Sequence, residues 1–112
     1  MPKPTTRAYS RYSTDAVQLI GSLIRSARKE RRLTSQDVAE RAGISRGLLQ
    51  RIEKGDLNCG IGAVFEVATI VGVKLFDADE TTLTKHKQVV EDKLTLLPKS
   101  IRKKTGPIID DF

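Results

Sequence analysis

The sequence contains little that would support a disulfide framework, a metal centre or a membrane anchor. Its 112 residues include one Cys, Cys59, one His, His86, and no Trp. A single Cys cannot form an internal disulfide, and one Cys with one His cannot supply the ligands of a structural zinc ion. The apolar runs are broken by charge or Gly well before the roughly 20 residues that a bilayer requires. The sequence therefore predicts no membrane span, no metal and no cofactor.

Motifs of catalysis are also missing. The sequence has no phosphate-binding loop, nucleophile elbow or metal-ligand spacing. Cys59 has no His near it in the sequence, and the adjacent Asp110 and Asp111 are typical of solvated acids. We therefore predict that the chain is not an enzyme. Since the first residues lack the apolar stretch of a secretory signal, we expect a cytoplasmic protein.

Positive charge is concentrated in the first half of the chain. The formal net charge is +6, and residues 1–55 hold 12 Lys and Arg against five Asp and Glu. A basic zone on a small domain favours a polyanionic partner such as nucleic acid, although many basic surfaces are only solvated. A basic amphipathic protein that binds RNA or a membrane surface is the alternative from another class.

The pattern of apolar residues divides the chain into three parts. Residues 1–12, with two Pro and no apolar period, predict a flexible arm, and residues 13–77 predict a helical domain. Residues 78–112 form a C-terminal extension. Within it, helical spacing predicts a helix over about 83–97, and the tail over 98–112 is expected to be flexible.

Within the helical domain, a first helix is expected from an N-cap at Ser13 or Thr14 to about Arg32. A later helix should begin near Ile61 and end at Gly72. The segment after it, 73–77, is short and alternates at first. An edge strand and a single helical turn both fit this segment, and the alternation slightly favours the strand.

Two short helices are predicted between these longer ones. Thr34 precedes Asp37 by three positions, as in a capping box, so one helix should span about Ser35 to Ala42. Gly43 suits the positive φ of a helix end, and Ser45 offers the N-cap of another helix that runs to Lys54. Two short helices joined by a Gly-centred turn form a helix-turn-helix.

In such a unit the second helix lies in the DNA major groove. Leu49 and Ile52 share one side of this helix and should pack on the preceding helix. Arg can donate two hydrogen bonds to guanine and Gln can pair with adenine, whereas Leu48 would touch a thymine methyl or simply be exposed. The predicted base contacts are Arg46, Gly47, Gln50 and Arg51, and the predicted phosphate contacts are Ser35, Gln36, Ser45, Lys54 and Arg28. Glu53 is expected to pair with Arg28 or Lys29.

The stretch from Leu33 to Gly55, LTSQDVAERAGISRGLLQRIEKG, closely resembles the phage-repressor-like (XRE or Cro/C1-type) helix-turn-helix family. The similarity covers roughly residues 14–76. It implies an all-α, compact five-helix bundle that binds an inverted-repeat operator in double-stranded DNA as a homodimer and represses transcription. The family usually has Gln at the first position of its second helix. Here Ser35 stands there and Gln36 follows, so either residue would take over that phosphate contact.

A narrower resemblance, carried by residues 72–79 and 99–112, is to HipB-like antitoxins. It implies that Val73, Leu75 and Phe76 form a short strand at the dimer interface. It also implies that the protein represses its own operon and that its C-terminal residues bind and neutralise a HipA-like Ser/Thr kinase toxin. The alternative within the wider family is a stand-alone repressor or restriction-system controller without a toxin.

Overall fold

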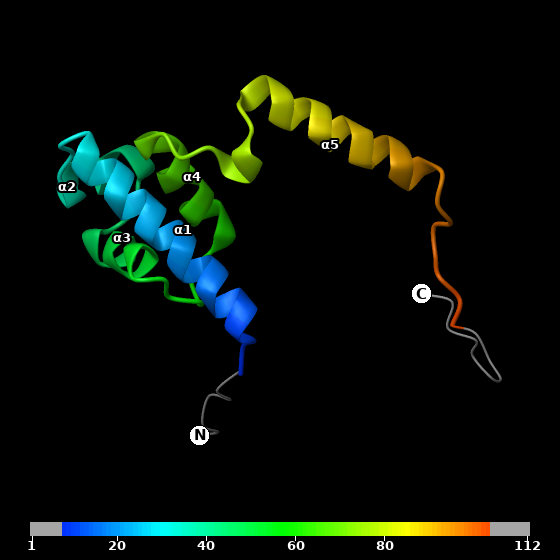
Figure 1. Ribbon diagram of the computed structural model, residues 1–112, viewed down its shortest axis with the longest axis horizontal. Helices are drawn as coiled ribbons and strands as arrows, with labels where there is room; N and C mark the ends of the chain where they lie inside the picture. The colour runs from blue at the N-terminus through cyan, green and yellow to red at the C-terminus, as the bar shows by residue number, and fades with distance from the viewer. Residues whose placement is uncertain (1–7, 104–112) are drawn as a thin grey trace. The chain divides into compact units, whose positions relative to one another are not determined.

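The computed structural model describes residues 8–103, and its regular structure is entirely helical (Figure 1). The chain divides after Asp77 into two compact units. In the described residues, the first unit holds four α-helices and a short 3₁₀ helix, and the second holds one α-helix. In chain order the elements are α1 (Arg11–Glu30), α2 (Ser35–Ala42), α3 (Arg46–Glu53), α4 (Ile61–Val71), η1 (Leu75–Asp77) and α5 (Glu80–Thr95). Over residues 8–103 there is no strand, so the predicted all-α class with five α-helices is confirmed.

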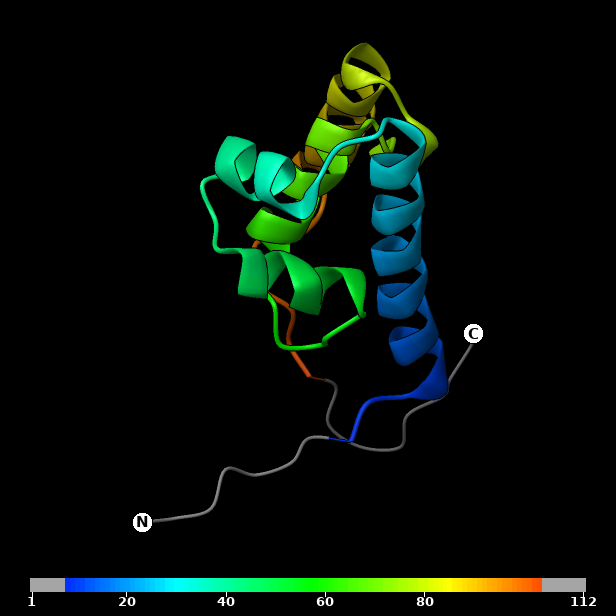
Figure 2. The same cartoon turned by 90° about the vertical axis from the view of Figure 1, so that its left-hand side faces the viewer.

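The first unit is a bundle of four helices around a small apolar core. α1 packs against α3 and α4, and α2 packs against the same two helices. In Figure 2, α1 runs along one side of this unit and the other three helices lie beside it. The fully or almost fully buried residues are Ile24, Val38, Ala39, Leu49, Ile52, Val67, Ala68 and Val71. Leu49 and Ile52 therefore face the core, as their spacing predicted.

The start and end of α1 differ from the prediction. Ser10, and neither Ser13 nor Thr14, is the N-cap, because the Ser10 Oγ accepts a hydrogen bond from the backbone N–H of Ser13 at 3.1 Å. Arg11 and Tyr12, expected in the arm, consequently belong to the helix. The helix ends at Glu30, and Arg32 has a φ of 57°, which takes the chain out of the helical path. Residues 1–7 of the predicted arm lie outside the described residues.

The helix-turn-helix forms as its capping residues predicted. The Thr34 Oγ1 accepts from the Asp37 N–H and the Asp37 Oδ2 accepts from the Thr34 N–H, both at 3.0 Å. The hydrogen bonds from Thr34 lower the pKa of the Asp37 carboxyl. Gly43 ends α2 with a φ of 67° and a ψ of 33°, a conformation that most other residues reach only with strain. Ser45 then caps α3 by accepting from the Leu48 N–H at 3.0 Å.

The prediction of a strand over residues 73–77 is wrong. Val73 donates its N–H to the Ala68 carbonyl at 2.8 Å, which closes the end of α4, and the chain continues into η1. Phe76 and Asp77 have φ values of 54° and 53°, which no extended strand contains. The alternation was misleading because Val73 and Leu75 both pack against the core, and residues 8–77 contain no strand with which this segment could pair.

The second unit contains α5, which begins three residues before the predicted start at 83. Asp79 is its N-cap, with Oδ1 accepting from the Thr82 N–H at 2.7 Å. No residue of the helix is buried. The helix ends at Thr95, two residues before the predicted end. Of the expected tail over 98–112, residues 104–112 lie outside the described residues.

Across residues 8–103, no helix combines the length and the apolar character that crossing a membrane demands.

Candidate nucleic-acid interface

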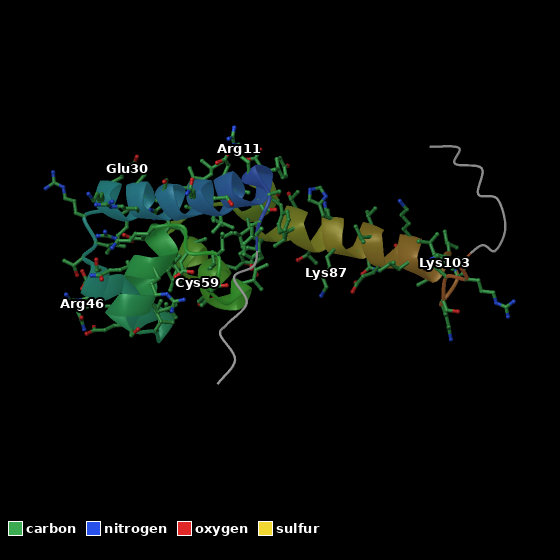
Figure 3. All side chains as sticks on the ribbon, turned by 90° about the horizontal axis from the view of Figure 1, so that it is seen from below. Arg11, Glu30, Arg46, Cys59, Lys87 and Lys103 are labelled. Carbon is green, nitrogen blue, oxygen red and sulfur yellow. The ribbon has the colours of Figure 1, made fainter. Side chains whose placement is uncertain are left out.

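α3 presents two faces of different character. Leu49 and Ile52 are buried, and Leu48 is half-buried and packs against the core, so it is not the exposed apolar residue that the sequence allowed. The remaining surface is solvent-exposed, and we call it the outer face of α3. It consists of Arg46, Gly47, Gln50 and Arg51, the four predicted base contacts. In Figure 3, Arg46 lies at the edge of the bundle, on the side of the Glu30 end of α1 and away from Arg11.

The inner side of α3 lies against α1 with almost no gap. A Cβ built on Gly21 would lie 2.5 Å from the carbonyl oxygen of Ile52 and 2.9 Å from that of Glu53. Only glycine fits between these backbones. The sequence analysis missed this role because Gly21 interrupts a helical pattern, where glycine is otherwise unfavourable.

An ion pair fastens the same two helices. The Arg28 Nε and Nη2 donate to the two carboxylate oxygens of Glu53 at 2.7 and 3.0 Å, and Nη1 donates to the Leu33 carbonyl at 3.1 Å. The side chains are 12% and 7% exposed. The hydrogen bond to Glu53 raises the pKa of Arg28 above its ordinary value. All three guanidinium nitrogens of Arg28 are therefore hydrogen-bonded within the protein. Of the two partners expected for Glu53, Arg28 and Lys29, the structure shows Arg28.

Beside this pair lies an open cleft of about 300 Å³ between α1, α2 and α3. Its lining residues are Arg25, Arg28, Ser35, Gln50, Glu53 and Lys54. Since Glu53 neutralises Arg28, the charge of the cleft is set by Arg25 and Lys54 and is positive. The cleft brings together four predicted contacts, namely Arg28, Ser35, Gln50 and Lys54. It adds Arg25, which the sequence showed only as one of several basic residues near the end of the first helix.

The other two predicted phosphate contacts have local partners. The Gln36 Nε2 donates to the Glu40 Oε1 at 2.7 Å on the exposed surface of α2. The Ser45 Oγ accepts the capping hydrogen bond, which leaves its hydroxyl hydrogen able to donate to another oxygen. Gln36 lies in the first turn of α2, and Ser45 is the N-cap of α3.

Arg51, at the far end of the outer face, is paired with a residue that the sequence analysis missed. Its Nε donates to the Asp56 Oδ2 at 2.8 Å, and the two side chains are 51% and 30% exposed. The hydrogen bond from Arg51, followed by one from the Asn58 N–H, lowers the pKa of the Asp56 carboxyl. An acidic residue directly after Gly55, the predicted end of the helix, was the available signal.

The three residues predicted at a dimer interface line an apolar groove of about 290 Å³. Val73 and Leu75 are half-buried, whereas Phe76 is 74% exposed and its ring meets the Phe65 ring edge to face, with centroids 6.1 Å apart. The other lining residues are Lys74, which lies between α4 and η1, and four residues of α1: Ala16, Leu19, Ile20 and Leu23. The groove therefore continues onto the exposed apolar residues of α1.

A family model described as a helix-turn-helix domain matches residues 19–80, more than half of the chain. The chain belongs to this helix-turn-helix family. The helix-turn-helix protein is also 36% identical over 70 residues to the immunity repressor protein of Bacillus phage phi105. The alignment covers 62% of this chain and 49% of that protein, so the chain spans about half the length of this curated relative. No solved structure matches the chain.

Residues 8–103 contain no group of three or more His, Cys, Asp or Glu that could hold a metal ion. Cys59 is half-buried, and burial raises the pKa of its thiol. Since the thiolate is the nucleophile, a raised pKa lowers the reactivity of this side chain at neutral pH.

Proposed function

We propose that this helix-turn-helix protein is a sequence-specific DNA-binding repressor of transcription. The observation that carries the proposal is the outer face of α3, where Arg46, Gln50 and Arg51 are exposed while Leu49 and Ile52 anchor the helix in the core. A helix held in this way can enter the major groove, and Gly47 lets its first turn approach the bases closely. The similarity to a phage immunity repressor supports the same function.

The cleft beside α3 supplies the phosphate contacts in this proposal. Arg25 and Lys54 carry charge that Glu53 does not neutralise, and Ser35 adds a hydroxyl at the start of α2. Gln36 and Ser45 contribute polar groups near the starts of α2 and α3. These groups set the position of the protein on the duplex and contribute little to the choice of sequence. Arg28 instead binds Glu53 and holds α1 to α3. In this proposal Arg25 therefore makes the phosphate contact that was predicted for Arg28.

The repressor would act as a homodimer on an inverted repeat. The apolar groove formed by Leu19, Leu23 and the segment Val73–Phe76 supports this, because a second copy would remove these side chains from water. A two-fold dimer that sets its two α3 helices about 34 Å apart would read half-sites one DNA turn apart. Phe76 contacts the second copy in this arrangement as an exposed side chain and not as part of a strand.

Single substitutions on the two kinds of contact test the DNA-binding proposal. Arg46→Ala is expected to relax the base preference at one position of each half-site, which costs about 1–3 kcal/mol of discrimination. Lys54→Ala is expected to weaken binding to all duplexes alike and to reduce the salt slope by about one. Arg11→Ala is the matched control, since Arg11 lies at the other end of α1 from Arg46. Equal losses for Arg46→Ala on selected and random duplexes would refute the assignment of α3.

Phe76→Asn tests the dimer interface. Asn tolerates the positive φ at this position and removes the exposed ring, so the fold should persist. We expect sedimentation to show more monomer and the inverted repeat to bind more weakly, with little change on a single half-site. An unchanged dimer fraction would rule out this groove as the interface.

The resemblance to HipB-like antitoxins suggests a second function, the neutralisation of a HipA-like kinase toxin. One observation favours it: α5 has no buried residue and exposes Val89, Val90 and Leu94, which a protein partner would cover. Without a toxin, the protein is a stand-alone repressor or a restriction-system controller. Expression of the whole native operon, followed by purification of this protein, decides between the antitoxin and the repressor without a toxin. A kinase that co-purifies with the full chain, and fails to do so with Val90→Asp/Leu94→Asp, would support the antitoxin function.

A further inference from the structure

The guanidinium of Arg51 is held by a carboxylate that is itself fixed to the backbone. The Asp56 N–H donates to the Arg51 carbonyl at 3.0 Å, and the Asp56 Oδ1 accepts from the Asn58 N–H at 2.8 Å. The other oxygen, Oδ2, accepts from the Arg51 Nε at 2.8 Å. Asp56 therefore has little freedom to move, and it passes that restraint to the Arg51 side chain.

This restraint uses only the Nε of Arg51 and leaves its terminal nitrogens, Nη1 and Nη2, available to bind another group. None of the hydrogen bonds within residues 8–103 uses the Arg51 Nη1 or Nη2, and the side chain is 51% exposed on the outer face of α3. A guanine offers two acceptors, O6 and N7, to a pair of parallel N–H donors in the major groove. With Nε occupied by Asp56, the two terminal nitrogens are the pair that remains for this contact. Much of the rotamer freedom of a long side chain is then lost before DNA arrives.

We propose that Asp56 is a positioning residue that orients Arg51 for a bidentate contact with guanine. The inference rests on the proposed reading of DNA by α3 and adds the base class and the group that enforces it. Asp56 has a second effect on the same choice. Its negative charge is repelled by every phosphate backbone, so it weakens binding to all duplexes, and only a duplex with guanine opposite Arg51 recovers the loss.

The experiment uses the full chain and a site that the wild-type protein selects from a pool of random duplexes. Affinities are then measured for the selected site, for its three substitutions at each position, and for random duplex. We expect Arg51→Ala to abolish the preference for guanine at one position. Asp56→Ala should reduce the preference at that same position by about tenfold, which is within the usual range for one bidentate pair. Its affinity for random duplex should rise, because one repelling charge is removed.

Two further variants separate positioning from a structural role. Asp56→Asn keeps an acceptor for the Asn58 N–H and so preserves the loop, and it should show the same direction of change. In the Arg51→Ala background, Asp56→Ala should have no effect on base preference, because the residue that it positions is absent. Asp15→Ala, which removes an exposed carboxylate from α1, is the matched charge control and should leave base preference unchanged.

The outcomes distinguish this inference from the function on which it rests. If the wild-type protein selects no sequence from the pool, the proposed repressor function fails, and the role of Asp56 fails with it. If the protein selects a site but Asp56→Ala and Asp56→Asn retain the full preference for guanine, only the positioning role is overturned. Equal weakening of all four bases by both variants would likewise overturn it.

Discussion

The two sides of α3 carry the same kind of ion pair in different surroundings. On the inner side, Arg28 and Glu53 bind through two hydrogen bonds, join residues 25 positions apart and are 12% and 7% exposed. On the outer side, Arg51 and Asp56 bind through one hydrogen bond, join residues five positions apart and are 51% and 30% exposed. The inner pair connects α1 to α3, whereas the outer pair restrains one side chain on the surface.

The difference shows that the energetic role of an ion pair depends on its exposure. When one partner of a largely shielded pair such as the inner one is removed, the other charge loses its partner where water reaches it only in part. When one partner of an exposed pair is removed, water solvates the other, and the effect on stability is small. The inner pair should therefore matter for folding, and the outer pair should matter for what α3 can bind.

The largest expected effect is the loss of the inner pair. Glu53→Ala should lower the free energy of unfolding by about 2–3 kcal/mol, because the half-buried Arg28 guanidinium loses the carboxylate that two of its nitrogens bind. Urea denaturation of the full chain measures this loss. The double variant Arg28→Met/Glu53→Leu is the control and should regain most of the stability. A loss well under 1 kcal/mol for Glu53→Ala would show that the pair does not hold the helices together.

The second effect concerns the close approach that the inner side requires. Gly21→Ala should lower the free energy of unfolding by about 2 kcal/mol, because the added methyl group collides with the Ile52 and Glu53 carbonyl oxygens. Gly62→Ala in α4 is the matched control: apart from the chain neighbours and the nearby backbone of α4 itself, no atom lies within 4 Å of its added Cβ, so we expect a gain of about 0.5–1 kcal/mol. Thermal unfolding of both variants checks the comparison, and similar changes in the two would contradict it.

A smaller effect is expected at Ser45, the N-cap of α3. Ser45→Ala should cost about 1 kcal/mol of stability through loss of the cap. Ser45→Asp retains an acceptor for the Leu48 N–H but places a negative charge beside the proposed DNA phosphates. Stability should therefore be kept in Ser45→Asp while affinity for every duplex falls. Unchanged affinity would remove Ser45 from the phosphate contacts.

The smallest effect is the pH dependence of the outer pair. Because the folded-state pKa of Asp56 is lowered, its contribution to stability is complete above the ordinary carboxyl pKa of about 3.9 and is lost as the pH falls through the lowered value. Stability should thus be insensitive to this pair at neutral pH. Titration of the Asp56 carboxyl carbon by NMR should give a pKa below the ordinary value in the wild type and a higher one in Arg51→Ala. Equal values would mean that the pair does not form in solution.

The sequence predicted the features that local chemistry determines. Gly43, the Thr34 and Asp37 capping box, and the spacing of Leu49 and Ile52 each specify a turn, a helix start or a buried face within a few residues. The segment 73–77 failed because five residues are too few to separate a period of two from one helical turn. Its outcome depended on the core, against which both Val73 and Leu75 pack.

The missed site residues share one property: their roles arise from contacts with other elements. Gly21 matters because the backbone at Ile52 lies against it, and Arg25 matters because α2 and α3 complete the cleft around it. Asp56 is close to Arg51 in the sequence, but its importance depends on a loop that returns to the end of α3. No helical period or motif encodes such relations between elements.

The short length of α3 limits how much information one protomer can read. Eight residues rise about 12 Å along the helix axis, which is about four base pairs of DNA at 3.4 Å each. Two protomers would then distinguish at most about 65,000 different words, fewer than the roughly 10⁶ or more sites that compete in a genome. In the proposed dimer, the spacing between half-sites and the deformability of the base pairs between them would therefore supply the rest of the sequence specificity.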